Sequence, residues 1–256
     1  MAPGIPLLRP TTFEDPRVRA VFSTRVGGVS EAPFDALNLS SREDDRGAVA
    51  ENLLRFCRAA EFRRCPPAVQ RQVHGSAVAW VGGDDGPEAG ELRERDGDGL
   101  ITRQPGQALA VQVADCVPVL LWDPGHGVVA AVHAGWRGTA AAIVRVALES
   151  MIRRARTNPR DLRVALGPSI GGCCYRVGPE VVEALKRIAP AEVVLADEGE
   201  RRVDLRAVNR WLLRSEGVLE ESIEDVGGCT CCDATLFSYR RDGPRTGRLM
   251  GAIELR

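Results

Sequence analysis

Three side chains suited to binding a transition metal each lie at the end of a stretch that reads as a β-strand. His74 ends VQRQVH, Cys116 ends ALAVQVADC and His133 ends VVAAVH. Side chains at strand ends project beyond the sheet, where ligands commonly bind. Two imidazoles and one thiolate suit zinc, and three protein ligands with an open fourth position are the arrangement of catalytic zinc. The spacings of 42 and 17 residues are long, so two capping or core histidines and a buried cysteine are the alternative.

Two further polar residues lie close to these positions in the sequence. Asp115 directly precedes Cys116 and could be a strand-end cap, a partner for a histidine N–H, or a general base that moves protons. Arg137 lies in HAGWRG, where the glycines allow close backbone approach to a ligand. Its guanidinium would then bind phosphate or carboxylate, unless it pairs with a local acid while Trp136 seals the core. The third histidine, His126, lies in the turn DPGHG, and we expect a solvated loop residue there.

A second group of cysteines competes with the first as a metal site. GGCTCCD contains Cys229, Cys231 and Cys232, and SIGGCCYRV contains Cys173 and Cys174. The C-x-x-C spacing from Cys229 to Cys232 could bind zinc or take part in redox exchange. The two clusters together could form a closed structural zinc site. The alternative is that these small residues only pack tightly beneath a functional site.

Arginines are concentrated near the C-terminus of the chain. FSYRRDGPRTGR combines Tyr239 with four arginines, and Arg25 in STRVGG could join them in an anion-binding wall. A solvated arginine loop is the alternative. The four arginines are Arg240, Arg241, Arg245 and Arg248.

Composition limits the class of protein. The 256 residues are 44% hydrophobic and carry a formal net charge of −1, so a sizeable core is expected and a polyanionic partner is not. No stretch reaches the ~18 apolar residues of a membrane helix, and the N-terminus does not resemble a signal peptide. We therefore expect a cytoplasmic protein that binds neither nucleic acid nor membrane. In a reducing compartment the eight cysteines are expected to be thiols or metal ligands, not a disulfide framework.

Apolar periodicity predicts strands and helices that alternate along the chain, which indicates an α/β fold with a mixed sheet in one domain. DPGHG predicts a hairpin between the strands on either side of it. Thr139 is expected to cap a long helix. The expected strands are 19–25, 69–75, 78–83, 100–102, 108–116, 117–123, 128–134, 161–167, 237–241 and 249–255, and the expected helices are 47–60, 139–156, 179–188 and 205–217.

Eight motifs along the chain resemble, in order, those of the YfiH-type laccase-domain proteins, also called the polyphenol oxidase or multicopper polyphenol oxidoreductase family. The resemblance spans residues 20–255, and ADC followed by HAGWRG is its most specific part. The motifs are STRVGGVS (23–30), LNLS (37–40), QVHG (72–75), DGLIT (98–102), ADCVPVLL (114–121), HAGWRGT (133–139), LGPSIGGCCY (166–175) and FSYRRDG (237–243).

The resemblance implies a fold and a metal site. The implied fold is a three-layer α/β/α domain over residues 1–256, similar to the catalytic domain of a cytotoxic necrotizing factor, with about 18 peripheral N-terminal residues. The implied metal is zinc, bound by His74, Cys116 and His133. Copper is less expected, because a multicopper oxidase needs many histidines and the chain has three, although a single copper could bind two histidines and a cysteine.

The resemblance also implies purine nucleoside chemistry: phosphorolysis of adenosine, inosine, guanosine and methylthioadenosine, and deamination of adenosine. The expected partners are a nucleoside and phosphate, in a monomer or homodimer. Asp115 is expected to move protons. An alternative is a Cys/His amide hydrolase that edits a peptidoglycan precursor, with Cys116 as nucleophile and His133 as base. The residues expected to bind substrate are Arg25, Asn38, Arg137, Arg240 and Arg241.

Overall fold

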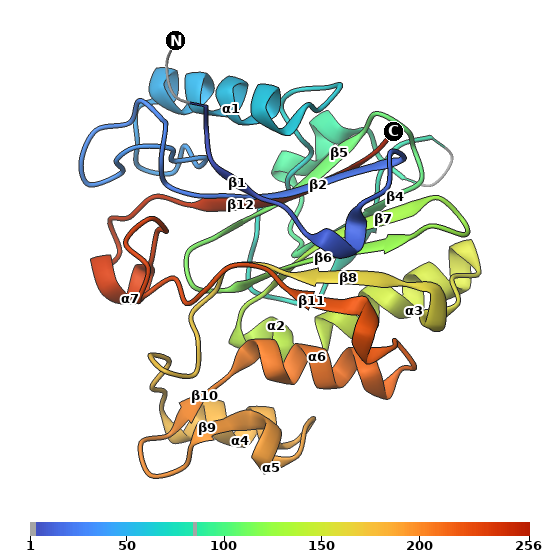
Figure 1. Ribbon diagram of the computed structural model, residues 1–256, viewed down its shortest axis with the longest axis vertical. Coiled ribbons are helices and arrows are strands. Elements are labelled where there is room, and N and C mark those ends of the chain that lie inside the picture. The colour runs from blue at the N-terminus through green and yellow to red at the C-terminus, as the bar shows by residue number, and fades with distance from the viewer. Residues whose placement is uncertain (1–3, 84–85) are drawn as a thin grey trace.

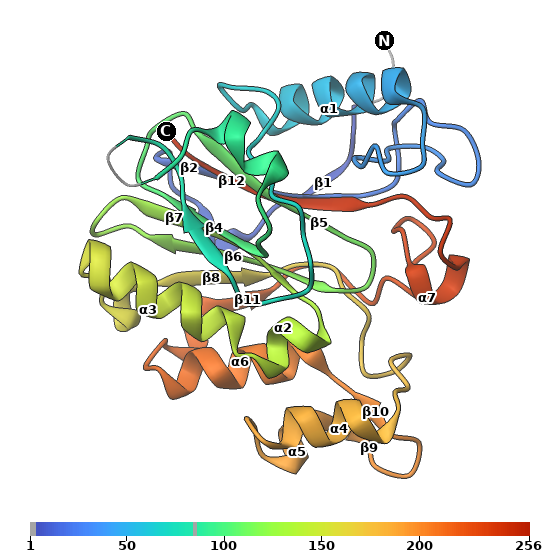
Figure 2. The same ribbon diagram turned by 180° about the vertical axis from the view of Figure 1, so that it is seen from behind.

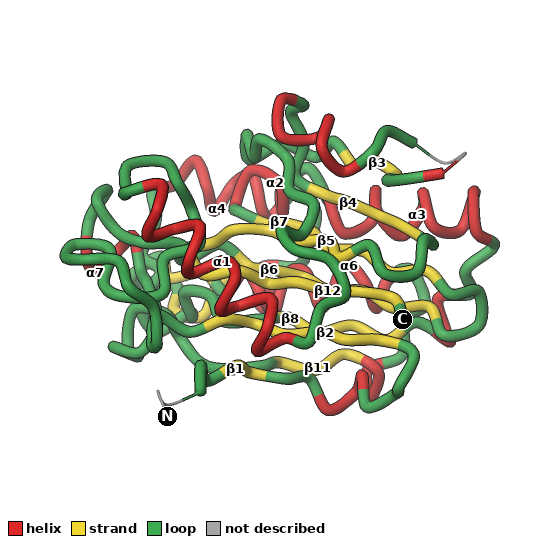
Figure 3. The backbone as a smooth tube through the Cα atoms, turned by 90° about the horizontal axis from the view of Figure 1, so that it is seen from above, coloured by secondary structure: helices red, strands yellow, loops and turns green. Residues whose placement is uncertain are grey.

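Two β-sheets pack face to face, and helices cover both outer surfaces (Figure 1). The computed structural model describes residues 4–83 and 86–256. The same four layers, helix, sheet, sheet and helix, are seen from behind in Figure 2. Seen from above, α1 (Arg46–Ala60) crosses over the strands of the first sheet (Figure 3).

The first sheet is antiparallel and has the order β1-β2-β12-β5. The C-terminal strand lies inside it, so that Ile253 is paired with Ala20 on one side and with Leu109 on the other. The N-terminal segment contributes the edge strand and the buried Phe13, whose ring lies edge-on to Trp122 at 6.0 Å. The strands are β1 (Leu7–Leu8), β2 (Val18–Ser23), β5 (Ala108–Val113) and β12 (Leu249–Leu255).

The second sheet is mixed and has the order β11-β8-β6-β7-β4-β3. The β3–β4 and β11–β8 pairs are parallel, and the others are antiparallel. The predicted hairpin around DPGHG is confirmed, with Trp122 opposite Val129. The strands are β3 (Val78–Trp80), β4 (Gly99–Thr102), β6 (Val117–Asp123), β7 (Val128–Ala134), β8 (Arg163–Leu166) and β11 (Ile223–Asp225).

Helices α2, α3 and α6 cover the outer face of the second sheet, and α4, α5 and a two-stranded ribbon lie beyond them (Figure 1). Among the described residues, no helix is long and apolar enough to cross a membrane. The bounds are α2 (Trp136–Ala140), α3 (Ile143–Ala155), α4 (Pro179–Lys186), α5 (Ala191–Val194), β9 (Leu195–Asp197), β10 (Arg202–Val203), α6 (Leu205–Ser215) and α7 (Tyr239–Asp242). Short 3₁₀ turns occupy Thr11–Phe13, Ala89–Glu94, Pro159–Asp161 and Glu220–Ser222.

The strands of the second sheet are apolar on both faces because both faces are buried. On β7, Val129 and Ala131 lie in the core between the two sheets. Their neighbours Val128, Ala130 and Val132 lie in the core beneath the helices. An uninterrupted apolar run is therefore what this position in the fold requires.

The expected three-layer arrangement is wrong, since the strands form two stacked sheets and the domain has four layers. Strands β5 and β6 follow each other in the sequence, yet they belong to different sheets. Apolar periodicity reports that a strand is buried, but it does not report which strand lies beside it. The likeness to a cytotoxic necrotizing factor stays a prediction.

Three local predictions are wrong. Thr139 lies buried inside α2, where its hydroxyl accepts a hydrogen bond from Asn209 Nδ2 at 3.0 Å, and Gly135 is at the N-cap instead. Residues 239–242 form a helical turn, not a strand, because the Ser238 side chain caps its first turn. Residues 69–75 form only an isolated bridge at Arg71.

One pair of cysteines also differs from expectation. Cys57 and Cys65 form a disulfide, whereas both had been expected to be thiols or metal ligands. Cys57 lies on the buried face of α1, and Cys65 lies in the loop that follows the helix.

The long loop after β2 is held to α1 by one buried amide. Asn52 is fully buried, and its Oδ1 accepts a hydrogen bond from Val29 N at 2.8 Å. Its Nδ2 donates to Ser30 Oγ and to the carbonyls of Ala36 and Asn38 at 2.9–3.0 Å. The loop backbone thus finds in one side chain the partners it would otherwise lack.

Asn52→Ala is expected to lower the free energy of unfolding by about 2–4 kcal/mol, since it leaves several buried polar groups without a hydrogen-bond partner. The measurement is urea denaturation. Glu51→Ala is the matched control, because it removes only an exposed pair with Arg55 and should change stability by less than about 0.5 kcal/mol. Equal effects of the two substitutions would contradict this role for the amide.

Candidate functional site

His74, Cys116 and His133, here called the metal trio, converge at one end of the second sheet. Cys116 directly precedes β6 and His133 is the penultimate residue of β7, so the antiparallel pairing of these strands brings them together. His74 approaches from the loop before β3, and its ring centroid lies 4.9 Å from that of His133. The ligand atoms of the trio all lie within 4.8 Å of one another. They could therefore hold one metal ion.

Asp98, at the entry to β4, holds both histidines. Its Oδ1 accepts a hydrogen bond from His133 Nδ1 at 2.7 Å and from the backbone N–H of His74 at 3.0 Å. Its Oδ2 accepts from the N–H groups of Gly75 at 2.7 Å and Val73 at 3.2 Å. These bonds hold His74 in a left-handed backbone conformation, with φ of +61°, that is uncommon for residues other than glycine.

The same carboxylate selects the tautomer of His133. With Nδ1–H donated to Asp98, the lone pair of Nε2 is left to bind a metal. Burial would raise the pKa of the Asp98 carboxyl, but the hydrogen bonds from His133 and Gly75 keep it below its usual value. Asp98 was not among the expected site residues, although it is the first residue of the DGLIT motif and directly precedes a fully buried strand.

Gly135 provides the space in which the trio meets. A Cβ at this position would lie 3.0 Å from Cys116 Sγ and 3.1 Å from His74 Cδ2. The glycines of HAGWRG were expected to leave space for a ligand. At Gly135 that space is occupied by the side chains of Cys116 and His74. The donor set and the space between the donors both fit a single zinc ion.

In the metal-free protein, Cys116 and His133 form a thiolate–imidazolium pair. Burial would raise the pKa of Cys116, but the charge and hydrogen bond of His133, with a hydrogen bond from His74, lower it to about 6. Burial would lower the pKa of His133, but the Cys116 thiolate and Asp98 raise it to about 9. Binding of a metal through His133 therefore requires release of a proton.

A cavity of about 770 Å³ lies over the metal trio. This is the size of a small-molecule site. Asp115 is the single carboxylate among the described residues that line it, so the cavity is strongly cationic. The cationic residues of the lining are Arg42, Arg71, Arg93, Arg137, Arg240 and Arg248.

Two of the expected substrate-binding residues line this cavity. The Arg137 guanidinium stacks on the Trp136 ring at 4.3 Å, and no carboxylate within residues 4–83 and 86–256 pairs with it. The Arg240 guanidinium lies 5.3 Å from the Tyr175 ring centroid and donates to the carbonyl of Arg176 at 2.9 Å. Trp136 packs partly buried against the helical side of the core.

The other three expected substrate-binding residues are absent from the described lining of the cavity. The Arg25 guanidinium donates to Asp35, and Arg241 is bound by Asp242 and by backbone carbonyls such as Leu236 O. The Asn38 side chain is buried, and its Oδ1 accepts from the backbone of Arg248. These side chains fasten the loops around the cavity.

Asp115 lines the cavity, but its carboxylate is engaged by its own chain. Oδ1 accepts from the hydroxyls of Thr230 at 2.6 Å and Ser238 at 2.7 Å, and Oδ2 accepts from Arg240 N at 2.6 Å. These three donors occupy both carboxylate oxygens and fix the side chain in place. The contacts favour a positioning role, and proton transfer by Asp115 stays a prediction.

Arg42 was not expected to bind substrate, and Arg248 was named only as part of a possible anion-binding wall, yet both line the cavity. Burial of Arg248, and then the charge of Arg42, lower the pKa of the Arg248 guanidinium. Two cations crowded in this way attract an anion between them. Arg248 carried a weak signal in the C-terminal arginine cluster, whereas Arg42 lies in a polar loop with no pattern to mark it.

Asp98→Asn is expected to weaken zinc binding by about 10–100-fold, because the amide no longer fixes His133 with the charge of a carboxylate. Competition with a chromophoric chelator measures this affinity. Asp123→Asn is the control, since Asp123 is a buried carboxylate that pairs with a histidine, the more exposed His126, at 3.0 Å and lies away from the metal trio. Unchanged zinc affinity in Asp98→Asn would show that this carboxylate does not orient the ligand.

Residues 19–256 match the family described as multi-copper polyphenol oxidoreductase laccase. A Deinococcus radiodurans protein named purine nucleoside phosphorylase is 40% identical over 254 residues, which cover 99% of this chain and 94% of that protein. A Mycobacterium tuberculosis protein with the same enzyme name is 41% identical over 238 residues, covering 93% and 92%.

Solved structures agree with these sequence matches. YlmD from Geobacillus stearothermophilus superimposes with a TM-score of 0.89 at 35% identity, over 100% of this chain and 97% of that one. The Bacillus licheniformis hypothetical protein YfiH superimposes with a TM-score of 0.85 at 34% identity, over 93% of each chain. The chain therefore belongs to the multi-copper polyphenol oxidoreductase laccase family, the YfiH-type family that its motifs resemble.

Proposed function

We propose that this protein is a zinc-dependent purine nucleoside phosphorylase. The observation that carries the proposal is a cationic cavity of about 770 Å³ placed directly over the metal trio. The enzyme name borne by relatives at 40–41% identity supports the same reaction. Adenosine, inosine, guanosine and methylthioadenosine are the proposed substrates, with deamination of adenosine as a second reaction at the same site.

The metal chemistry rests on His74, Cys116 and His133. When bound there, zinc supplies a Lewis acid that polarises a substrate oxygen or lowers the pKa of water. Asp98 orients His133, and Gly135 leaves room for the donors to meet. The family description names a multicopper enzyme, but the third histidine of the chain, His126, pairs with Asp123 at the far end of the β6–β7 hairpin. A trinuclear copper cluster has too few ligands here.

Phosphate binding is assigned to the crowded arginines of the cavity. Arg248 is half-buried beside Arg42, and a phosphate between them would offset their mutual repulsion with charge-assisted hydrogen bonds. Arg137 and Arg240 extend the cationic lining. The exposed ring of Tyr239, also in the lining, offers an aromatic surface for the purine.

Amide hydrolysis is the second candidate function, and one observation favours it. In the metal-free protein the low pKa of Cys116 and its contact with His133 are the properties of an activated cysteine nucleophile. A peptidoglycan-precursor amide would then be the substrate. This candidate predicts a zinc-free protein that forms an acyl-enzyme at Cys116.

Phosphate-dependent release of base from a nucleoside panel tests the main proposal. Wild-type protein is expected to release base only when phosphate is present. His74→Ala and Cys116→Ser should each lower kcat/KM by at least about 100-fold, since each removes a metal ligand that polarises the substrate. If the zinc-loaded wild type releases no base from any nucleoside, the phosphorylase assignment fails.

Arg248→Gln is expected to raise the KM for phosphate by about 10–100-fold, because it removes one or more charge-assisted hydrogen bonds to the anion. The KM for nucleoside should change much less. Initial rates at varied phosphate concentration provide the measurement. Arg245→Gln is the matched control, since Arg245 is exposed on the same loop and absent from the described lining of the cavity. Equal effects of the two substitutions would remove Arg248 from the phosphate site.

A further inference from the structure

A second set of sulfur ligands lies outside the metal trio, on two neighbouring loops. One loop follows β8 and carries Cys173 and Cys174, and the other follows β11 and carries Cys229 and Cys232. Because β8 and β11 are parallel neighbours, both loops leave the same edge of the sheet. A backbone bridge between Ser169 and Cys229 continues that pairing into the loops.

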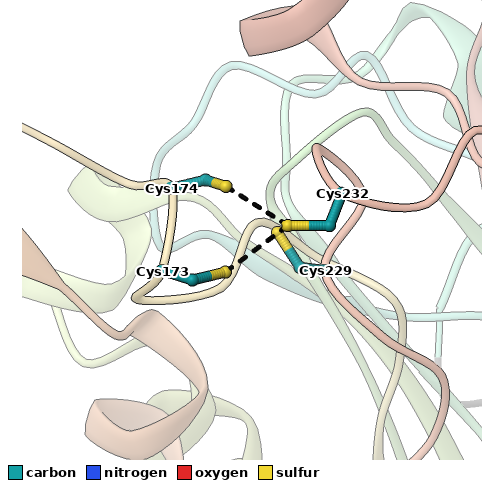
Figure 4. Close-up of side chains that lie close together, drawn as sticks. All are labelled: Cys173, Cys174, Cys229 and Cys232. Atoms are coloured by element: carbon teal, nitrogen blue, oxygen red, sulfur yellow. Dashed lines mark hydrogen bonds between the residues drawn. The ribbon is translucent and has the colours of Figure 1, made fainter.

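The four sulfur atoms point toward one another across the gap between the loops (Figure 4). Cys232 Sγ lies 3.4 Å from Cys174 Sγ and 3.7 Å from Cys173 Sγ, and all four sulfurs lie within 4.8 Å of one another. A tetrahedral zinc ion with bonds of about 2.3 Å holds its sulfur ligands about 3.8 Å apart. The cluster therefore has the dimensions of a site for one ion.

Other arrangements of these sulfurs fit less well. A disulfide requires an S–S distance of about 2.05 Å, and all four cysteines are free thiols, unlike Cys57 and Cys65. An iron–sulfur cluster spreads its cysteine ligands over several iron atoms, which separates their sulfurs by more than a single ion does.

The surroundings are built for closely spaced sulfur atoms. The backbone N–H of Gly171 donates to Cys229 Sγ at 3.2 Å. A Cβ on Gly171 would lie 3.3 Å from both Cys173 Sγ and Cys229 Cβ, so a side chain at this position would crowd the cluster. The same glycine carbonyl accepts from Cys174 N at 2.9 Å, which closes the turn that presents the adjacent cysteines.

Two arginines lie close enough to reduce the net negative charge that four thiolates and a zinc ion would carry. Four thiolates and one divalent ion sum to a net charge of −2. Arg202 Nη1 donates to the carbonyl of Cys173, and Arg240 Nη1 donates to the carbonyl of Cys174, each at 3.5 Å. Two guanidinium groups thus lie beside the pair of adjacent cysteines, and that of Arg202 also pairs with Asp197 at 2.6 Å.

We propose that a second zinc ion binds in this cluster as a closed, four-coordinate structural site. All four positions of the tetrahedron are taken by protein ligands, so no position is left for water or substrate. Tetrahedral coordination by four sulfurs selects zinc over the harder cations. The ligands are Cys173, Cys174, Cys229 and Cys232.

The site fastens two walls of the nucleoside cavity. Tyr175, which lines the cavity, directly follows Cys174, and Thr230, which donates to Asp115, directly follows Cys229. Asp115 in turn holds the backbone of Arg240 at 2.6 Å. A metal that joins the two loops would therefore fix the positions of Tyr175 and Arg240 without touching the substrate.

Metal stoichiometry tests this proposal on the full chain, by elemental analysis after purification with added zinc. The wild type is expected to contain two zinc ions per chain and Cys174→Ser one. Cys231→Ser is the matched control, because Cys231 lies between two of the ligands but is outside the cluster, and it should retain two. His74→Ala should lose the ion of the metal trio and keep the ion of the cysteine cluster. The two variants therefore distinguish the loss of one site from the loss of the other.

Cobalt substitution gives a second readout that needs no enzyme activity. Thiolate-to-cobalt charge-transfer absorption should reflect four thiolates from the cluster and one from Cys116 in the wild type. In Cys174→Ser the absorption should fall to about the intensity expected from the single thiolate of Cys116. In Cys231→Ser it should equal that of the wild type. One zinc per wild-type chain, iron in place of zinc, or a Cys229–Cys232 disulfide in the purified protein would overturn the proposal. The wild-type result does not depend on the folding of any variant.

Discussion

The hydrogen bonds of the buried Asp98 carboxylate organise the functional end of this fold. A buried carboxylate is costly unless it is paired and hydrogen-bonded. Here a single side chain meets the imidazole of His133 and the backbone of residues 73–75. The loop that carries His74 is also held by an isolated bridge at Arg71 and by hydrogen bonds between the Gln72 side chain and the backbone of Gln112. The bonds to Asp98 fix the three residues of the loop that lie at the metal trio.

A second carboxylate, Asp115, accepts hydrogen bonds from other loops around the cavity. It receives hydrogen bonds from Thr230, Ser238 and Arg240, which lie more than 100 residues later in the chain. Both acids are hydrogen-bonded within the fold, and the other charged residues that line the cavity are arginines. This arrangement of charges gives the cavity a cationic lining. The cysteine cluster lies beside this part of the cavity, because Thr230, which donates to Asp115, directly follows Cys229.

Much of the site was predictable because local signals coincide there. Cys116 and His133 each lie at the end of an apolar stretch, and the β6–β7 hairpin that joins them has a turn sequence that marks it. The motifs of the family cover nearly the whole chain and agree with the family match. The arginines were predicted less well. Arg137 and Arg240 reach the cavity, whereas Arg25, Asn38 and Arg241 are bound by acids and backbone of their own loops.

The sequence by itself determined the residue types that do chemistry, the main helices and most strands, since apolar periodicity and turn residues are local properties. Only the tertiary structure decided that the strands form two sheets, because periodicity does not identify a strand's neighbour. It alone brought Asp98 to His133 and Arg42 to Arg248, since these pairs lie 35 and 206 residues apart. It also chose among the open alternatives for the cysteines, bonding Cys57 to Cys65 and gathering four others around one point. Contacts of this kind depend on how distant loops meet at a sheet edge, and no spacing along the chain encodes that.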